Sequence, residues 1–96
     1  MDIKYEITIE AYELNINRLT NQIWKLIPMK EHEEKWEGQL ITVLIELTGL
    51  GEVINRQKQF LPLLSKLEGL RVGDWDFKDY RKTVFECISL LREIRL

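Results

Sequence analysis

Apolar residues recur along this chain at alternating spacings of three and four. The longest series is Tyr5, Ile9, Tyr12, Ile16, Leu19, Ile23 and Leu26. Only a helix places such residues on one face, so the pattern predicts a helix over residues 4–27. Residues 3–9 also alternate between apolar and polar side chains, as a strand does, and strand and helix both stay open for residues 2–9. Pro28 is expected to end this helix or to begin the next, because proline lacks a backbone N–H.

Two further helices are predicted in the middle of the chain. The first spans residues 29–48, and Gly49 and Gly51 are expected to stop it, because glycine accepts the left-handed conformation at a helix end. The second begins near residue 52, and Pro62 is expected to kink it or to break it. A short helix would then cover residues 62–68 and end at Gly69, and residues 70–75 would form a loop.

The last helix has a well-marked start. Asp76 is suited to the N-cap and Asp79 follows three residues later, while Trp75 and Tyr80 flank the cap as an apolar pair. Beyond this point the three-four spacing continues to the end of the chain through Tyr80, Val84, Cys87, Leu91 and Ile94.

These elements predict an all-α fold of one domain, residues 1–96. Short connections favour an up-down bundle of four main helices, with the third kinked or broken near Pro62. The chain has 96 residues, 45% of them hydrophobic, and only five glycines and two prolines. So few turn-forming residues argue against a sheet-rich domain.

Two of the predicted helices carry more apolar surface than a small bundle needs. On the helix over residues 29–48, the stripe of Trp36, Leu40, Val43 and Leu47 is widened by Ile41, Leu44 and Ile45 to an apolar arc of about 220°. On the first helix, a second and weaker stripe consists of Ile3, Ile7 and Leu14. Exposed apolar patches mark association sites, so we expect a homodimer through one of these helices. The alternative is that an irregular bundle buries all of these side chains.

Three tryptophans add to this expectation. Trp36 lies on the main stripe of its helix and is predicted to be a core residue. Trp24 and Trp75 lie off the main stripes and are candidate anchors for a protein partner, since tryptophan is frequent at the centre of interfaces.

Charge and cysteine content narrow the function further. The net charge is −2, and the basic residues of the last helix, Lys78, Arg81 and Lys82, are interspersed with acids, so nucleic-acid binding is not expected. The single cysteine, Cys87, lies on a core stripe and is predicted to be inert. No apolar run reaches the ~18–20 residues of a membrane span, and the N-terminus lacks a signal-peptide pattern. We therefore predict a cytoplasmic protein without a membrane partner.

The glutamates of residues 31–37 are the only candidate metal site. Glu33, Glu34 and Glu37 form an E-E-x-x-E pattern, and Glu52 follows fifteen residues later. Three carboxylates within two turns of one helix could hold Mg²⁺. The simpler interpretation is that acidic side chains complement the positive end of a helix dipole. A third is that they surround a protein-binding surface at Trp36. His32 has no second histidine at the spacing of a zinc site.

This glutamate pattern resembles the metal motif of the MazG-like all-α nucleotide pyrophosphohydrolases, in which E-x-x-D follows on the next helix. Glu33, Glu34, Glu37 and Glu52 match the motif, and Asn55 stands where the aspartate is expected. The resemblance implies a Mg²⁺-dependent pyrophosphohydrolase that uses these four glutamates, and the neutral Asn55 puts the fourth part of the motif in doubt.

The sequence therefore favours a small non-catalytic helical module for protein interaction or regulation. It would act as a homodimer or bind a larger protein partner, and it would need no cofactor. The pyrophosphohydrolase is the alternative enzyme. A helical inhibitor or immunity-type protein is a third possibility, although such a protein would be expected to have a face of one charge sign.

Overall fold

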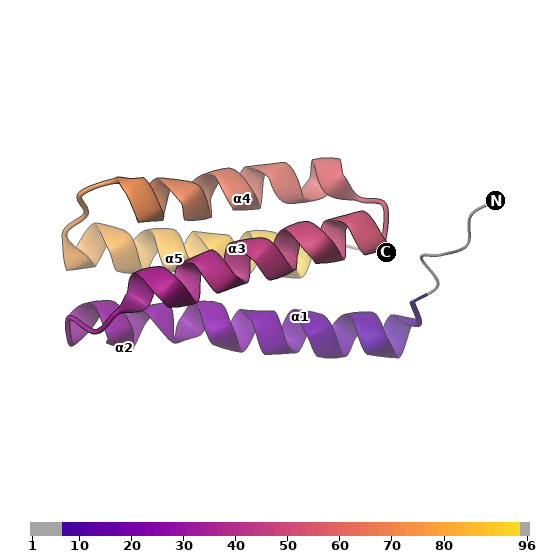
Figure 1. Cartoon of the computed structure of the whole chain (residues 1–96), viewed down its shortest axis with the longest axis horizontal. Coiled ribbons are helices and arrows are strands. Elements are labelled where there is room, and N and C mark those ends of the chain that lie inside the picture. The colour runs from indigo at the N-terminus through magenta and orange to yellow at the C-terminus, as the bar shows by residue number, and fades with distance from the viewer. Residues whose placement is uncertain (1–6, 95–96) are drawn as a thin grey trace.

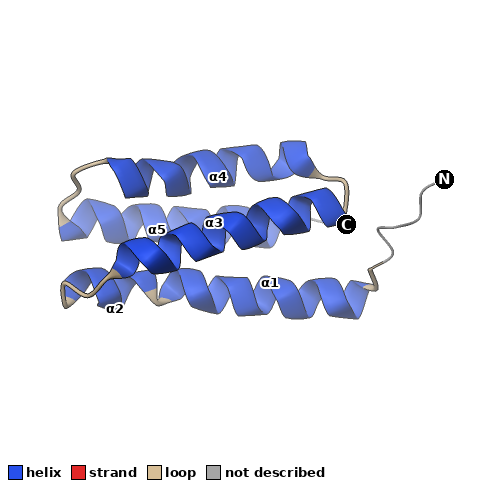
Figure 2. Ribbon diagram, viewed as in Figure 1, coloured by secondary structure: helices blue, strands red, loops and turns tan. Residues whose placement is uncertain are grey.

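The structure, a computed structural model, describes residues 7–94 and places five helices among them (Figure 1). They are α1 (Ile9–Trp24), α2 (Leu26–Glu31), α3 (Trp36–Val53), α4 (Gln57–Val72) and α5 (Phe77–Glu93). Within this range the chain forms helices, turns and loops but no strand (Figure 2). The predicted all-α fold with four main helices is confirmed.

The four long helices pack around a common core. α1 contacts α3 and α5, and α4 also contacts α3 and α5, so that α1 and α4 lie on opposite sides of the bundle. The short α2 follows α1 and contacts α1, α3 and α5 at one end (Figure 1). In the described part of the chain, no helix combines the length and the hydropathy needed to cross a membrane.

The core stripe predicted for the first helix is confirmed from Tyr12 onward. Tyr12, Ile16, Leu19, Ile23 and Leu26 are all buried. Tyr12 also donates a hydrogen bond from its hydroxyl to the carbonyl oxygen of Ile94, at 3.0 Å, and so links α1 to the end of α5. Ile9, at the start of α1, is 64% exposed, so the stripe is not buried there, and Tyr5 lies outside the described residues.

The boundaries predicted for this first helix are corrected at both ends. The helix begins at Ile9, because the hydroxyl of Thr8 caps it by accepting a hydrogen bond from the N–H of Ala11 at 3.0 Å. Ile7 and Thr8 are in neither helix nor strand, and residues 2–6 lie outside the described range. α1 ends at Trp24, and α2 holds Pro28 in its first turn, where a missing N–H is tolerated.

The single helix predicted over residues 29–48 is wrong. Residues 29–31 belong to α2, residues 32–35 form a connection, and α3 begins at Trp36. In the connection Glu33 has a φ of 56°, in the left-handed region. This conformation interrupts the helix that the residue pattern alone would continue.

The helix stop predicted at Gly49 and Gly51 is also wrong, since α3 runs through both glycines to Val53. Leu47 and Leu50 lie in the core on this part of the helix, and Ile54 follows immediately after it. Burying each such side chain contributes about 1.5–3 kcal/mol, which exceeds the ~1 kcal/mol that a glycine costs inside a helix. The helix ends instead before Asn55, which adopts a φ of 58°.

Of the two alternatives predicted at Pro62, the break is wrong, and so is the end predicted at Gly69, because α4 is continuous from Gln57 to Val72. A kink at Pro62 stays a prediction. Phe60, Leu63, Leu67 and Leu70 are buried on both sides of the proline, and their burial outweighs the ~3 kcal/mol penalty of a proline in a helix. Of the predicted loop, residues 70–72 are helical and only 73–76 connect α4 to α5.

The start and the core stripe of the last helix are confirmed. The Asp76 side chain caps α5 by accepting a hydrogen bond from the N–H of Asp79 at 2.8 Å. Tyr80, Val84, Cys87, Leu91 and Ile94 are all buried.

Candidate interaction surface

α3 buries the face that the sequence predicts. Leu40, Val43 and Leu47 have no exposed surface, and Trp36 and Leu44 are partly buried against the core. Trp36 packs edge-on against the ring of Tyr80 on α5, with 5.2 Å between ring centroids, and the ammonium of Lys30 lies 5.0 Å from the Trp36 ring. Trp36 is therefore partly buried and packs against the core, on the side of α3 where the sequence predicts it.

The opposite side of α3 is unusually apolar for a surface that faces solvent. On a helical wheel with about 100° per residue, uncharged residues lie opposite the buried stripe from Gly38 to Gly49, and Glu52 follows on the same side. We call this set the outer α3 face, and it consists of Gly38, Ile41, Thr42, Ile45, Thr48 and Gly49. Ile41 is 43% exposed and Ile45 is 67% exposed. Leu44, Ile45, Thr48, Gly49 and Glu52 line a shallow hollow along it.

The two threonines of this face add little polarity. The hydroxyl of Thr42 donates to the carbonyl of Gly38 at 3.0 Å, and that of Thr48 donates to the carbonyl of Leu44 at 2.8 Å. Because both hydroxyl protons are used within the helix, the side chains present their methyl groups beside the isoleucines.

The two glycines of this face are not in close contact with any other part of residues 7–94. A Cβ atom added at Gly38 or Gly49 would meet nothing within 4 Å. At Gly51, on the inner side of the same helix, an added Cβ would lie 3.3 Å from Cδ1 of Phe60. Gly51 thus allows α4 to approach α3. Gly38 and Gly49 have no side chain on the outer face, so the backbone of another molecule could approach α3 closely there.

Charged side chains are absent from the centre of this surface. Between Glu37 and Glu52 the only charged residue of α3 is Glu46. Its carboxylate forms an ion pair with Arg18 on α1, so this charge is turned to the side of the helix. α3 contains no basic residue, and its outer face is therefore apolar with one glutamate near each end.

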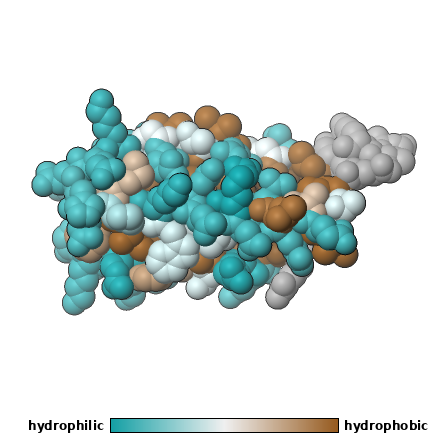
Figure 3. Space-filling view, turned by 90° about the horizontal axis from the view of Figure 1, so that it is seen from below, coloured by the Kyte–Doolittle hydropathy of each residue, from teal (hydrophilic) through white to brown (hydrophobic). Residues whose placement is uncertain are grey.

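The second apolar stripe predicted on the first helix does not form a comparable surface in the described residues. Ile7 is partly buried against the core, Leu14 is 70% exposed, and Ile3 lies outside the described range. The side of the molecule on which α1 lies is mostly hydrophilic, with hydrophobic atoms in separate patches (Figure 3).

The two tryptophans proposed as anchors differ in their surroundings. Trp24 is 41% exposed and packs edge-on against Phe85 of α5, at 4.9 Å between centroids. The guanidinium of Arg81 lies over the Phe85 ring, 4.8 Å from its centroid. Trp75 is half-buried, and its indole N–H donates to the carbonyl of Gly69 at 2.9 Å, which ties the connection before α5 to the end of α4.

The four glutamates of the metal hypothesis are not brought together. Glu33 and Glu34 lie in the connection before α3, Glu37 lies in its first turn, and Glu52 lies near its last residue. Fifteen residues of helix separate Glu37 from Glu52 by about 22 Å. The described residues contain no group of three or more His, Cys, Asp or Glu side chains that could hold a metal ion. The one-helix arrangement of Glu33, Glu34 and Glu37 is thus wrong, as is the placement of Glu52 on the following helix.

Cys87 is buried in the core on α5. Burial is the main reason that its pKa is raised to about 12, so the thiol is neutral at physiological pH and is not poised as a nucleophile. His32 is exposed at the end of α2.

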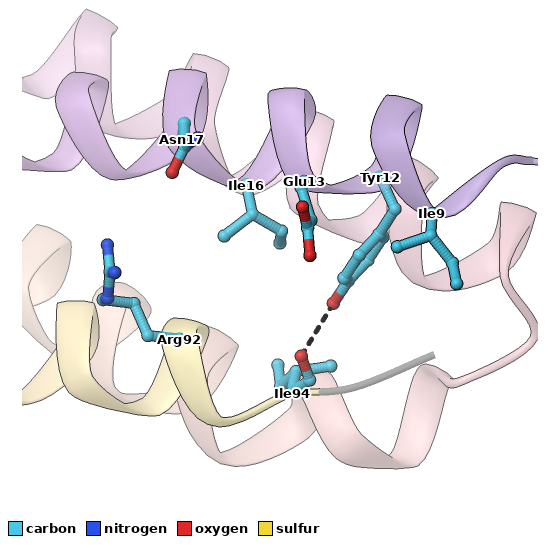
Figure 4. Close-up of a pocket in the computed structure, with 7 residues that line it drawn as sticks. All are labelled: Ile9, Tyr12, Glu13, Ile16, Asn17, Arg92 and Ile94. Atoms are coloured by element: carbon cyan, nitrogen blue, oxygen red, sulfur yellow. Dashed lines mark hydrogen bonds between the residues drawn. The ribbon is translucent and has the colours of Figure 1, made fainter.

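A pocket that the sequence pattern does not indicate lies between the start of α1 and the end of α5 (Figure 4). It is lined by Ile9, Tyr12, Glu13, Ile16, Asn17, Arg92 and Ile94. The Tyr12–Ile94 hydrogen bond closes one side of it. Its lining offers one carboxylate and one guanidinium but no cysteine, histidine or serine that could act as a nucleophile or base.

The comparisons with known proteins give no match: no family model, no curated protein and no solved structure is similar to this chain.

The sequence pattern drew attention to Ile41 and Ile45 but missed the glycines and threonines beside them. If Gly49 is taken as a helix stop, it falls outside the helix and its position on the outer α3 face is not recognised. The signal was present in the spacing of residues 38, 41, 45, 48 and 49, which share one side of a helix once the helix is extended to residue 53.

Proposed function

We propose that this protein is a helical protein-interaction module with a regulatory role, and that it acts by docking the outer α3 face against another protein surface. It would do so in the cytoplasm, as a homodimer or with a larger protein partner. In this proposal the four long helices form an up-down bundle, which their short connections favour.

The observation that carries the proposal is the composition of the outer α3 face. Ile41 and Ile45 are exposed between two glycines with open space above them, no charged side chain lies on this face from Gly38 to Gly49, and Glu52 borders it. Contiguous apolar surface of this kind is typical of interaction sites, whereas apolar residues scattered singly need no such explanation.

The alternative enzyme is not proposed, because the glutamates on which it depends are spread along the whole length of α3 and the connection before it. Trp24 remains a candidate for a second contact point, since its ring is partly exposed and packs against Phe85, over which the Arg81 guanidinium lies.

The experiment compares two exposed apolar residues on different helices. Ile45→Lys places a charge at the centre of the outer α3 face, and Leu14→Lys places one on α1 at a position of similar exposure, 70% against 67%. Solution mass is measured by light scattering, and tagged protein is recovered from an extract of the native host with its bound proteins identified by mass spectrometry.

We expect wild type and Leu14→Lys to share the same association, with themselves or with a specific host protein, and Ile45→Lys to lose it. A wild-type mass near 11.5 kDa together with identical host proteins on wild type and Ile45→Lys would refute the proposal. Loss only in Leu14→Lys would move the interaction surface to α1.

A further inference from the structure

We draw no further inference here: the strongest candidate, the pocket between the start of α1 and the end of α5, holds one exposed carboxylate and one exposed guanidinium, of Glu13 and Arg92, and nothing in residues 7–94 shows which ligand would bind between them.

Discussion

α3 and α5 are of nearly equal length, 18 and 17 residues, and each buries one face in the same core, yet their outer sides differ. α5 presents Lys78, Lys82 and Glu86 to solvent, and Glu86 pairs with Lys66 of α4 at 3.3 Å. α3 presents Ile41 and Ile45 between glycines. The inner faces of both helices are explained by the fold, and the outer face of α3 is the surface on which the proposed interaction depends.

The N-terminal ends of α3 and α5 also differ. α5 is capped by Asp76, whose side chain binds a free N–H of the first turn, while Lys35 before α3 forms no side-chain capping hydrogen bond. Local sequence thus specifies where α5 begins, and packing of Trp36 and Leu40 against the core specifies the start of α3.

The largest expected effect separates the two sides of α3. Leu47→Ala removes a side chain with no exposed surface and should lower the free energy of unfolding by about 2–5 kcal/mol. Ile45→Ala, two residues away on the outer face, should change it by less than about 0.5 kcal/mol. Urea denaturation followed by tryptophan fluorescence, at a concentration low enough to avoid association, measures both. Equal losses would mean that Ile45 is part of the monomer core.

A smaller effect is expected from the difference in capping. Asp76→Ala removes the hydrogen bond to the N–H of Asp79 and should lower the free energy of unfolding by about 0.5–2 kcal/mol. Lys35→Ala at the corresponding position before α3 should leave it almost unchanged, because no side-chain cap is lost there. The same denaturation measurement applies, and a larger loss for Lys35→Ala would show that α3 depends on a cap the structure does not contain.

The smallest effect compares glycines on the two sides of α3. Gly49→Ala should raise the free energy of unfolding of the monomer by about 0.5–1 kcal/mol, because alanine favours the helix and its Cβ meets open space. Gly51→Ala should gain less or lose stability, because its Cβ would lie 3.3 Å from the Phe60 ring. The comparison fails if thermal melts show an equal gain for both.

The helical stripes were predictable because burial requires a fixed spacing. Tyr12, Ile16 and Leu19 on α1, and Tyr80, Val84 and Cys87 on α5, are buried as their three-four spacing predicts. The Asp76 cap was also predictable, since capping depends on residues within one turn of each other.

The helix ends near Gly49, Gly51 and Pro62 were not predictable in the same way. Glycine and proline oppose a helix by roughly 1–3 kcal/mol at one position, and their neighbours decide the outcome. Leu50 and Leu63 are buried beside these residues, and the core contacts of such side chains outweigh the local penalty. A local sequence pattern also contains no information on contacts between different helices, such as the close approach of Phe60 on α4 to Gly51 on α3.

The glutamate pattern shows the same division between local and tertiary information. The E-E-x-x-E pattern predicts three glutamates on one helix, but Glu33 adopts a left-handed conformation, and Glu33 and Glu34 lie in the connection before α3. By itself the sequence determined the helical class and the residues that must face a core, because the periodicity of apolar side chains is a local property. Only the tertiary structure decided which apolar side chains stay uncovered on α3, because that depends on which helices happen to lie against each face.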